Sequence, residues 1–230
     1  MLKAKFRPPK RQDVIERPRL TNKIQKAASS NCIWMAGAPG SGKTTAALQY
    51  LESTGAPYVW YRLDRDDSTP AGFFESAKAL TVGLNKSCDD LPSFTLAEHK
   101  NVYRFAETFF AHLFENWNPP FCCVVDDYPD APSDSMIHRL MVIAISCLPT
   151  NCHLIILSRS LPKGDLVRLL VNGEISLIDR EEIIFDESEM REFLISNNIL
   201  DDDEIRKISE QAKGWIAGII LLLHGKKNVD

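Results

Sequence analysis

Residues 37–44 read Gly37-Ala-Pro-Gly-Ser-Gly-Lys-Thr44 and match the pattern G-x-x-x-x-G-K-[ST] at every position. With average residue usage, a chance match in a chain of this length is expected in about one sequence in a hundred. The apolar residues 32–36 come directly before the pattern, and a helix over residues 43–53 is predicted to follow it and to end at Gly55. A strand that leads through a glycine-rich loop into a helix is the context that this phosphate-binding pattern requires.

The residue types in this loop suit a phosphate group. Its glycines let the backbone curl until several N–H groups face one anion, and the start of the next helix adds a partial positive charge. Lys43 would contact the outer phosphates, Thr44 would offer a hydroxyl to Mg²⁺, and Thr45 would reach the next phosphate inward. The candidate phosphate-binding residues are Gly37, Ala38, Pro39, Gly40, Ser41, Gly42, Lys43, Thr44 and Thr45.

A second apolar run, residues 121–125, ends in two carboxylates, Asp126 and Asp127. Ligands of open α/β sheets bind at the carboxyl ends of the strands, so both acids are predicted to lie beside the phosphate loop. Asp126 is the candidate Mg²⁺ ligand together with Thr44, and Asp127 is the candidate group that polarises an attacking water. Acids are also common in turns after strands, so two aspartates alone would not define a site.

Arg159 follows a third apolar run, residues 153–157. An arginine at the end of a neighbouring strand can reach the outermost phosphate and report its presence. The catalytic candidates are thus Lys43, Asp126, Asp127 and Arg159. Three more acids follow the aromatic run 58–63, and the residues alone do not decide whether they line the site or belong to a solvated loop. These acids are Asp64, Asp66 and Asp67.

Apolar strands alternate with helical segments along the chain, which predicts an α/β fold. The strands are apolar throughout rather than at every second residue, as in a parallel sheet that helices cover on both faces. The expected strands are residues 32–36, 58–63, 121–125, 153–157 and 175–178, and the expected helices are residues 21–28, 43–53, 70–84, 98–117 and 135–147. The sequence predicts a P-loop NTPase sheet of about five parallel strands flanked by helices.

The chain changes character after residue 183. Asp186 and Glu189 form a capping-box pattern at the start of one helix, and helices near 203–212 and 215–224 are expected to follow. These segments are predicted to form a small helical lid subdomain. The expected organisation is an N-terminal arm with a short helix at residues 1–30, the NTPase domain at residues 31–183 and the lid at residues 184–230.

The composition fits a folded domain with a mildly acidic surface. The chain has 27 Lys and Arg against 31 Asp and Glu, a net charge of −4, and 44% of its residues are hydrophobic. This balance argues against a protein that coats nucleic acid. No apolar stretch is long enough to span a membrane, and no export signal opens the chain. We therefore expect a cytoplasmic location, no membrane partner, and free thiols at the six cysteines, which lack metal-ligand spacing.

Further short motifs occur in a fixed order around the phosphate loop. They are Lys5-Phe-Arg-Pro-Pro9, Arg17-Pro-Arg-Leu20, Val59-Trp-Tyr-Arg-Leu-Asp64, Val124-Val-Asp-Asp-Tyr128, Leu157-Ser-Arg-Ser-Leu-Pro162 and Gly214-Trp215. With them the chain resembles, over nearly its whole length, the nucleotide-binding oligomerisation region of the STAND-type ATPases. It is most similar to that region of the MalT-like, large ATP-binding regulators of the LuxR class.

The resemblance implies that the arm, here Arg17, Arg19 and Leu20, contributes to an adenine and ribose pocket. It also implies that Arg159 senses the γ-phosphate and that the lid closes over the nucleotide, with Gly214-Trp215 facing it. ATP and ADP with Mg²⁺ are then the expected ligands, and no guanine-reading N-K-x-D segment is present. In such regulators a winged-helix domain, a repeat-rich sensor and a DNA-binding helix-turn-helix follow the lid. Inducer and DNA are therefore expected to bind only through parts absent from this chain.

Two functions from different classes fit these observations. The first is a regulatory switch, in which ADP holds a resting form, ATP permits self-association into a homo-oligomer, and slow hydrolysis resets the protein. The second is a stand-alone P-loop NTPase or small-molecule kinase, since P-loop folds host many chemistries. A kinase lid would need basic residues to clamp an acceptor, whereas this lid begins with the acidic residues 201–204 and ends apolar. The sequence therefore favours the switch module of a transcriptional regulator with weak ATPase activity, and the intact Lys43, Thr44 and Asp126 disfavour a purely structural module.

Overall fold

A five-stranded, fully parallel sheet forms the middle of the computed structural model, which describes residues 4–10, 15–80, 91–115, 117 and 120–227. The strand order is β2-β3-β4-β1-β5. The strands are β1 (Cys32–Ala36), β2 (Tyr58–Arg62), β3 (Phe121–Tyr128), β4 (Cys152–Ser158) and β5 (Ile175–Ile178). Because β1 pairs with both β4 and β5, the strand that leads into the phosphate loop lies inside the sheet. The predicted α/β fold with a parallel sheet of five strands is confirmed.

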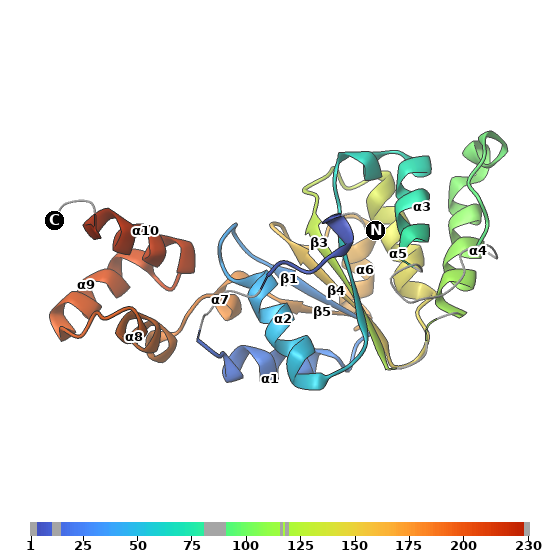
Figure 1. Cartoon of the computed structure of the whole chain (residues 1–230). Helices are drawn as coiled ribbons and strands as arrows, with labels where there is room; N and C mark the ends of the chain where they lie inside the picture. The colour runs from blue at the N-terminus through green and yellow to red at the C-terminus, as the bar shows by residue number, and fades with distance from the viewer. Residues whose placement is uncertain (1–3, 11–14, 81–90, 116, 118–119, 228–230) are drawn as a thin grey trace.

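Helices cover both faces of this sheet (Figure 1). One face carries α1 (Pro18–Ala27) and α2 (Lys43–Thr54), and the other carries α3 (Pro70–Ala79), α4 (Val102–Glu115), α5 (Met136–Ser146) and α6 (Asp165–Val171). Successive strand residues point to opposite faces, so Trp34 packs with the α3–α6 side while Ile33 and Met35 pack with α1 and α2. The inner strands β1, β3 and β4 are buried on both sides along most of their length, which explains their apolar runs, whereas the edge strand β5 is only half-buried at Ser176 and Leu177.

The last three helices pack around a hydrophobic cluster of their own at one end of the molecule (Figure 1). They are α8 (Glu187–Ser196), α9 (Asp202–Ala212) and α10 (Ile216–Lys227), and they follow the short helix α7 (Arg180–Ile183). Their cluster includes Phe193, Leu194 and Ile219, and Ile15 of the arm packs against it. The arm therefore reaches the lid helices as well as the sheet, which places it between the two parts of the chain.

Two helices begin differently from the sequence expectation. α1 begins at Pro18 rather than after Thr21, because proline fits the first helical turn, where its missing N–H has no acceptor to lose. The predicted helix at residues 98–117 starts as a 3₁₀ helix, Leu96–Asn101, and becomes α-helical only at α4.

Other differences concern short or irregular segments. The short helices α6 and α7 were not predicted, because four to seven residues carry too little periodicity to separate a helical turn from a loop. β3 runs three residues beyond the predicted strand and includes both aspartates. The end of the predicted helix 70–84 lies partly outside the described residues.

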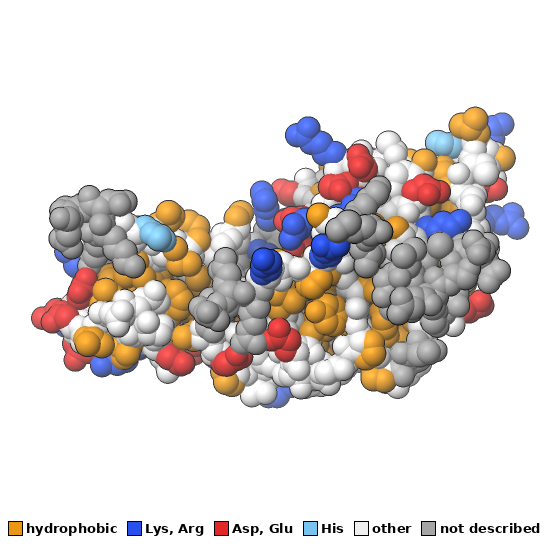
Figure 2. All heavy atoms as spheres, viewed as in Figure 1, with side chains coloured by type: hydrophobic (Ala, Val, Ile, Leu, Met, Phe, Trp, Pro, Cys, Tyr) orange, Lys and Arg blue, Asp and Glu red, His pale blue; other side chains and the backbone are white. Residues whose placement is uncertain are grey.

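Charged side chains are unevenly distributed over the molecular surface. Figure 2 shows Lys and Arg side chains gathered near the centre of the visible face, and Asp and Glu side chains at the outer end of the lid helices. Among the helices that the structure describes, none has the length and apolar character needed to cross a membrane. The cysteines within the described residues are free thiols, as predicted, and Cys88 lies outside them. They are Cys32, Cys122, Cys123, Cys147 and Cys152.

Candidate functional site

The phosphate loop leaves β1 at the carboxyl edge of the sheet and enters α2 directly. Its first residue, Gly37, donates a backbone hydrogen bond to the Ser158 carbonyl at 3.1 Å, which ties the loop to the end of β4. Gly40 and Gly42 have φ angles of +70° and +93°, a left-handed conformation that favours glycine. These two glycines explain why the loop curls tightly before α2 begins at Lys43.

Lys43 extends back across the mouth of this loop. Its Nζ donates to the carbonyl oxygens of Gly37 and Ala38, at 2.6 and 3.0 Å. Burial lowers the pKa of Lys43, while the charges of Asp126 and Asp127 act to raise it and that of Arg159 to lower it. Lys43, Asp126, Asp127 and Arg159 therefore lie within electrostatic range of one another.

Asp126 and Asp127 occupy an irregularity in β3. The pairing of Val125 with Ile156 resumes only at Tyr128 with Ser158, so the two aspartates interrupt the regular β3–β4 register. Asp127 has a φ of +55°, which is uncommon for a residue with a side chain, and residues in such strained conformations cluster at functional sites. Its backbone N–H donates to Asp126 Oδ1 at 2.9 Å.

The two carboxylates differ in their surroundings. Asp126 is buried and Asp127 is exposed. Burial raises the pKa of Asp126, because its charged form is desolvated and the Asp127 charge repels it, and the Asp127 N–H and Arg62 offset this only in part. A cation beside Asp126 would relieve the same penalty. With the half-buried Thr44 hydroxyl at the start of α2, Asp126 offers the oxygen donors that Mg²⁺ prefers, so the residues present fit this metal.

Arg62 is a member of the site that sequence reasoning missed. It ends β2 opposite Asp126, with Nη2 3.8 Å from Asp126 Oδ2 and Nε 3.5 Å from Asp127 Oδ2. Its place at the carboxyl end of a strand was the available signal. The sequence alone assigns Arg62 to an aromatic strand and does not pair it with Asp126, which lies sixty-four residues further along the chain.

Two of the three acids in the loop after β2 have a structural role, because Asp64 and Asp67 form a capping box with each other and both pair with Lys5. Asp67 is buried and accepts hydrogen bonds from the Tyr61 hydroxyl at 2.8 Å and from Lys5 Nζ at 3.0 Å. Asp64 and Asp67 also border a cleft of about 450 Å³ that Asp127 and Met136 line. Asp66 is not among the residues that line this cleft. The loop is thus partly a cap that anchors the N-terminal residues and partly a wall beside Asp127.

Arg159 lies on the other side of the phosphate loop. It is exposed and lines a cleft of about 470 Å³ together with Gly37, Ala38 and Arg180. The predicted sensor arginine is therefore adjacent to the first residues of the loop, where it is free to meet an anion.

The lid contacts the phosphate loop directly. The indole Nε1 of Trp215 donates to the Pro39 carbonyl at 3.0 Å, and the Ala217 N–H donates to the Gly40 carbonyl at 3.1 Å. The approach is close, because a Cβ added to Gly42 would lie 2.5 Å from Ile216 Cδ1. A small cavity of about 150 Å³ remains between the loop, the arm and α10, and its lining includes Arg17, Thr45 and Phe185.

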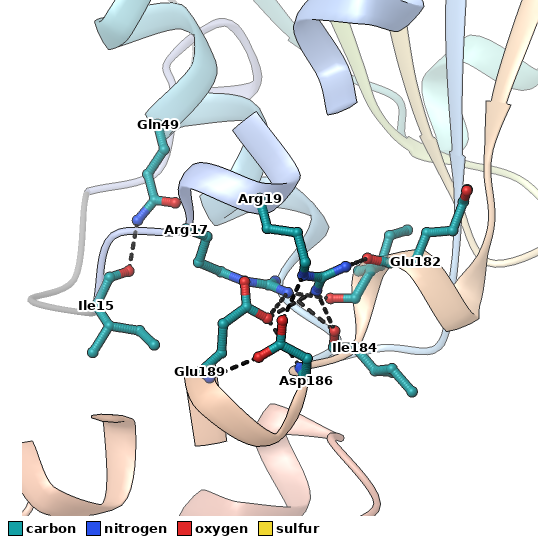
Figure 3. A network of polar contacts seen from close by, with 9 residues as sticks. Ile15, Arg17, Arg19, Gln49, Glu182, Ile184, Asp186 and Glu189 are labelled. Atoms are coloured by element: carbon teal, nitrogen blue, oxygen red, sulfur yellow. Dashed lines mark hydrogen bonds and ion pairs between the residues drawn. The ribbon is translucent and has the colours of Figure 1, made fainter. Parts of the chain in front are cut away.

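The three predicted arm residues occupy different environments. Arg17 is almost fully buried and lines the small cavity. Arg19 instead bonds to the segment that enters the lid, at the carbonyl oxygens of Glu182 and Ile184 (Figure 3). Leu20 is fully buried in the hydrophobic cluster under α1 and α2. Of the three, Arg17 is the residue whose position lets it meet a ligand beside the phosphate loop.

Sequence comparisons relate the chain to regulators. A protein-family model described as Nephrocystin 3, N-terminal, matches residues 10–159. Over 224 residues, which are 94% of this chain, the sequence is 27% identical to the HTH-type transcriptional regulator MalT of Yersinia pestis strain Pestoides F, and the match covers 24% of that regulator. The chain therefore spans about a quarter of the length of the curated relatives that it matches.

Solved structures share the fold at low sequence identity. A signal transduction ATPase with numerous domains and a tetratricopeptide repeat sensor, from Pyrococcus horikoshii, aligns with a TM-score of 0.59 and 13% identity over 94% of this chain and 31% of that chain. A Walker-type ATPase of Pyrococcus abyssi aligns with a TM-score of 0.53 and 14% identity over 97% of this chain and 71% of that chain. The architecture is that of the P-loop ATPases.

Proposed function

The chain belongs to the family described as Nephrocystin 3, N-terminal, and from this premise we propose that it is the ATP- and ADP-binding switch module of a signal-responsive transcriptional regulator. The observation that carries the proposal is the phosphate loop at the end of β1, with Lys43 Nζ across its mouth and Asp126 and Asp127 near the end of β3. The regulatory role rests on the similarity to a transcriptional regulator over 94% of the chain.

In this proposal the residues divide the work by chemistry. The loop residues 37–45 hold the phosphates through backbone N–H groups, and Lys43 neutralises the outer ones. Thr44 and Asp126 would hold Mg²⁺, which would supply positive charge to offset that of the phosphates. Asp127 is exposed at the same edge and orients a water for slow hydrolysis, while Arg159 distinguishes a nucleotide with a γ-phosphate from one without.

The lid contacts suggest how nucleotide would change the protein. The lid meets the loop at Pro39 through the Trp215 indole, just before α10, and at Gly40 through the backbone N–H of Ala217 in α10. A loop that rearranges around phosphates would move these two carbonyls, and the lid would respond because its docking depends on them. ADP would favour one lid position and ATP another. In the ATP form, the new lid position would expose a surface through which copies of the chain self-associate.

The proposal is tested by titrating the chain with ADP and with a non-hydrolysable ATP analogue, both with Mg²⁺, and by following hydrolysis of ATP and molar mass by light scattering. Both nucleotides should bind, the mass should rise only with the ATP analogue, and turnover should be far slower than the roughly 1 to 1,000 per second typical of enzymes. Absence of binding for both nucleotides would reject the proposal.

Arg159→Ala should weaken binding of the ATP analogue about tenfold and leave ADP binding unchanged, because one charge-assisted contact to the γ-phosphate would be lost. Calorimetric titration of the two ligands measures the difference. Arg168→Ala, which removes an exposed arginine of α6, serves as the control and should change neither affinity. Equal losses for ADP and the ATP analogue would contradict a sensor role for Arg159.

One observation supports the second candidate, a stand-alone P-loop NTPase or small-molecule kinase. The cleft of about 450 Å³ beside Asp127 combines apolar residues with carboxylates, and pockets of this kind bind small molecules. An acceptor seated there would lie next to the proposed catalytic acid. Rapid ATP turnover that depends on a small acceptor would favour this candidate over the switch.

A further inference from the structure

Arg17 is held by the lid along one edge of its guanidinium group. Its Nε donates to Glu189 Oε1 at 3.1 Å, and its Nη2 donates to Glu189 Oε2 at 3.0 Å (Figure 3). Nη2 also donates to the carbonyl oxygens of Ile183 and Ile184, at 2.8 and 3.1 Å. This is a paired contact between arginine and carboxylate, which fixes the plane and the direction of the guanidinium.

The opposite corner of the same group has no partner. The Arg17 side chain is only 3% exposed, yet its Nη1 makes no hydrogen bond within the described residues. Nη1 lies 3.6 Å from the point that a Cβ on Gly42 would occupy, so it faces the phosphate loop. The ring of Phe185 packs against the guanidinium, with its centroid 4.7 Å from Arg17 Cζ. A buried donor without a partner is costly, and here it borders the small cavity between loop, arm and lid.

The Glu189 carboxylate both caps a helix and binds two arginines. Glu189 is the third residue of α8, where its Oε2 accepts the Asp186 N–H at 3.1 Å and completes a capping box. The same oxygen accepts hydrogen bonds from Arg17 and Arg19. Burial alone would raise the pKa of Glu189, but the hydrogen bonds from the two arginines outweigh it and the pKa lies below the usual value. The carboxylate is thus held in its charged form, as a partner for Arg17.

We infer that Glu189 is a positioning residue, which holds the guanidinium of Arg17 so that its free Nη1 donates to an acceptor atom of the bound nucleotide. The inference rests on the function proposed above and adds a residue of the lid to the nucleotide site. Through this pair the first lid helix, α8, shares in nucleotide binding. Nucleotide affinity should therefore depend on a side chain 172 residues away from Arg17 in the sequence.

Glu189→Gln separates positioning from capping, because glutamine also completes a capping box whereas the charge that holds Arg17 is lost. ADP affinity, measured by calorimetric titration, should fall about tenfold. Glu182→Gln is the matched control. Glu182 is the third residue of α7, where it completes a capping box with Asp179, and its carboxylate pairs with Lys23 rather than with Arg17. ADP affinity of this control should equal that of the unmodified chain.

The double variant Arg17→Gln with Glu189→Gln shows whether Glu189 acts through Arg17. If it does, the double variant binds ADP as weakly as Arg17→Gln alone, because no guanidinium remains to be positioned. Losses that add would overturn the inference and leave Glu189 with a structural role only. If Glu189→Gln alone does not fold, the comparison of the double variant with Arg17→Gln still tests the inference. The double variant buries no unpaired Arg17 charge and is therefore expected to fold.

Hydrogen exchange of the nucleotide-free protein gives a readout that does not depend on ligand. Residues 15–20 should exchange faster in Glu189→Gln than in Glu182→Gln, because the arm loses its ionic attachment to the lid. Equal ADP affinity in Glu189→Gln and the unmodified chain would overturn the inference while leaving the proposed function intact. Failure of the unmodified chain to bind ADP would instead reject the proposed function.

Discussion

Lys43→Ala is expected to weaken binding of both ADP and ATP by about a hundredfold or more. Lys43 is the one cation that the phosphate loop itself supplies, and its Nζ already lies at the loop mouth against the carbonyl oxygens of Gly37 and Ala38. Alanine removes the charge that would meet the outer phosphates and leaves the loop backbone in place. Calorimetric titration with each nucleotide measures the loss.

The matched control is Lys26→Ala, which removes an exposed lysine from the last turn of α1. Its nucleotide affinity should equal that of the unmodified chain, and circular dichroism should show that both variants are folded. Unchanged ADP and ATP affinity in Lys43→Ala would contradict the assignment of residues 37–45 as the phosphate site.

The second large effect is expected at Asp127, where removal of the carboxylate should lower hydrolysis about a hundredfold and leave nucleotide affinity almost unchanged. Asp127→Ala removes the group that would orient water, but alanine is disfavoured at the φ of +55° found there. Asp127→Asn tolerates this conformation and removes the charge, so it is the cleaner variant. Phosphate release and calorimetric titration on the same protein separate catalysis from binding.

Asp130→Asn is the control for this pair, because Asp130 is an exposed acid three residues further along the chain that pairs with Lys163. It should hydrolyse ATP at the rate of the unmodified chain. Turnover in Asp127→Asn equal to that of the control would reject a catalytic role for Asp127, whatever the effect of alanine.

Local sequence was sufficient for the sheet and the phosphate loop. The strands were predictable because runs that are buried on both faces are mostly apolar, and the loop pattern placed Lys43 at the start of α2. Resemblance to MalT-type regulators followed from motif order and is confirmed by a match over 94% of the chain. These features depend on residues that are neighbours in the sequence.

The parts that could not be predicted depend on distant partners or short segments. Glu189 reads as a capping residue in the sequence, and only the fold brings it to Arg17. Arg62 meets Asp126 because β2 and β3 are adjacent, which strand hydrophobicity does not specify. Leu20 carries no local sign that separates a core position from a pocket position, and the fold places it in the core under α2.

The most direct test of a nucleotide switch is the identity and exchange rate of the nucleotide that co-purifies with the chain. The proposed function predicts bound ADP, detected by chromatography of the denatured protein, that exchanges slowly with added ATP because the lid contacts the loop at Pro39 and Gly40. An empty site with rapid ATP turnover that requires a small acceptor would contradict the switch and identify a kinase instead.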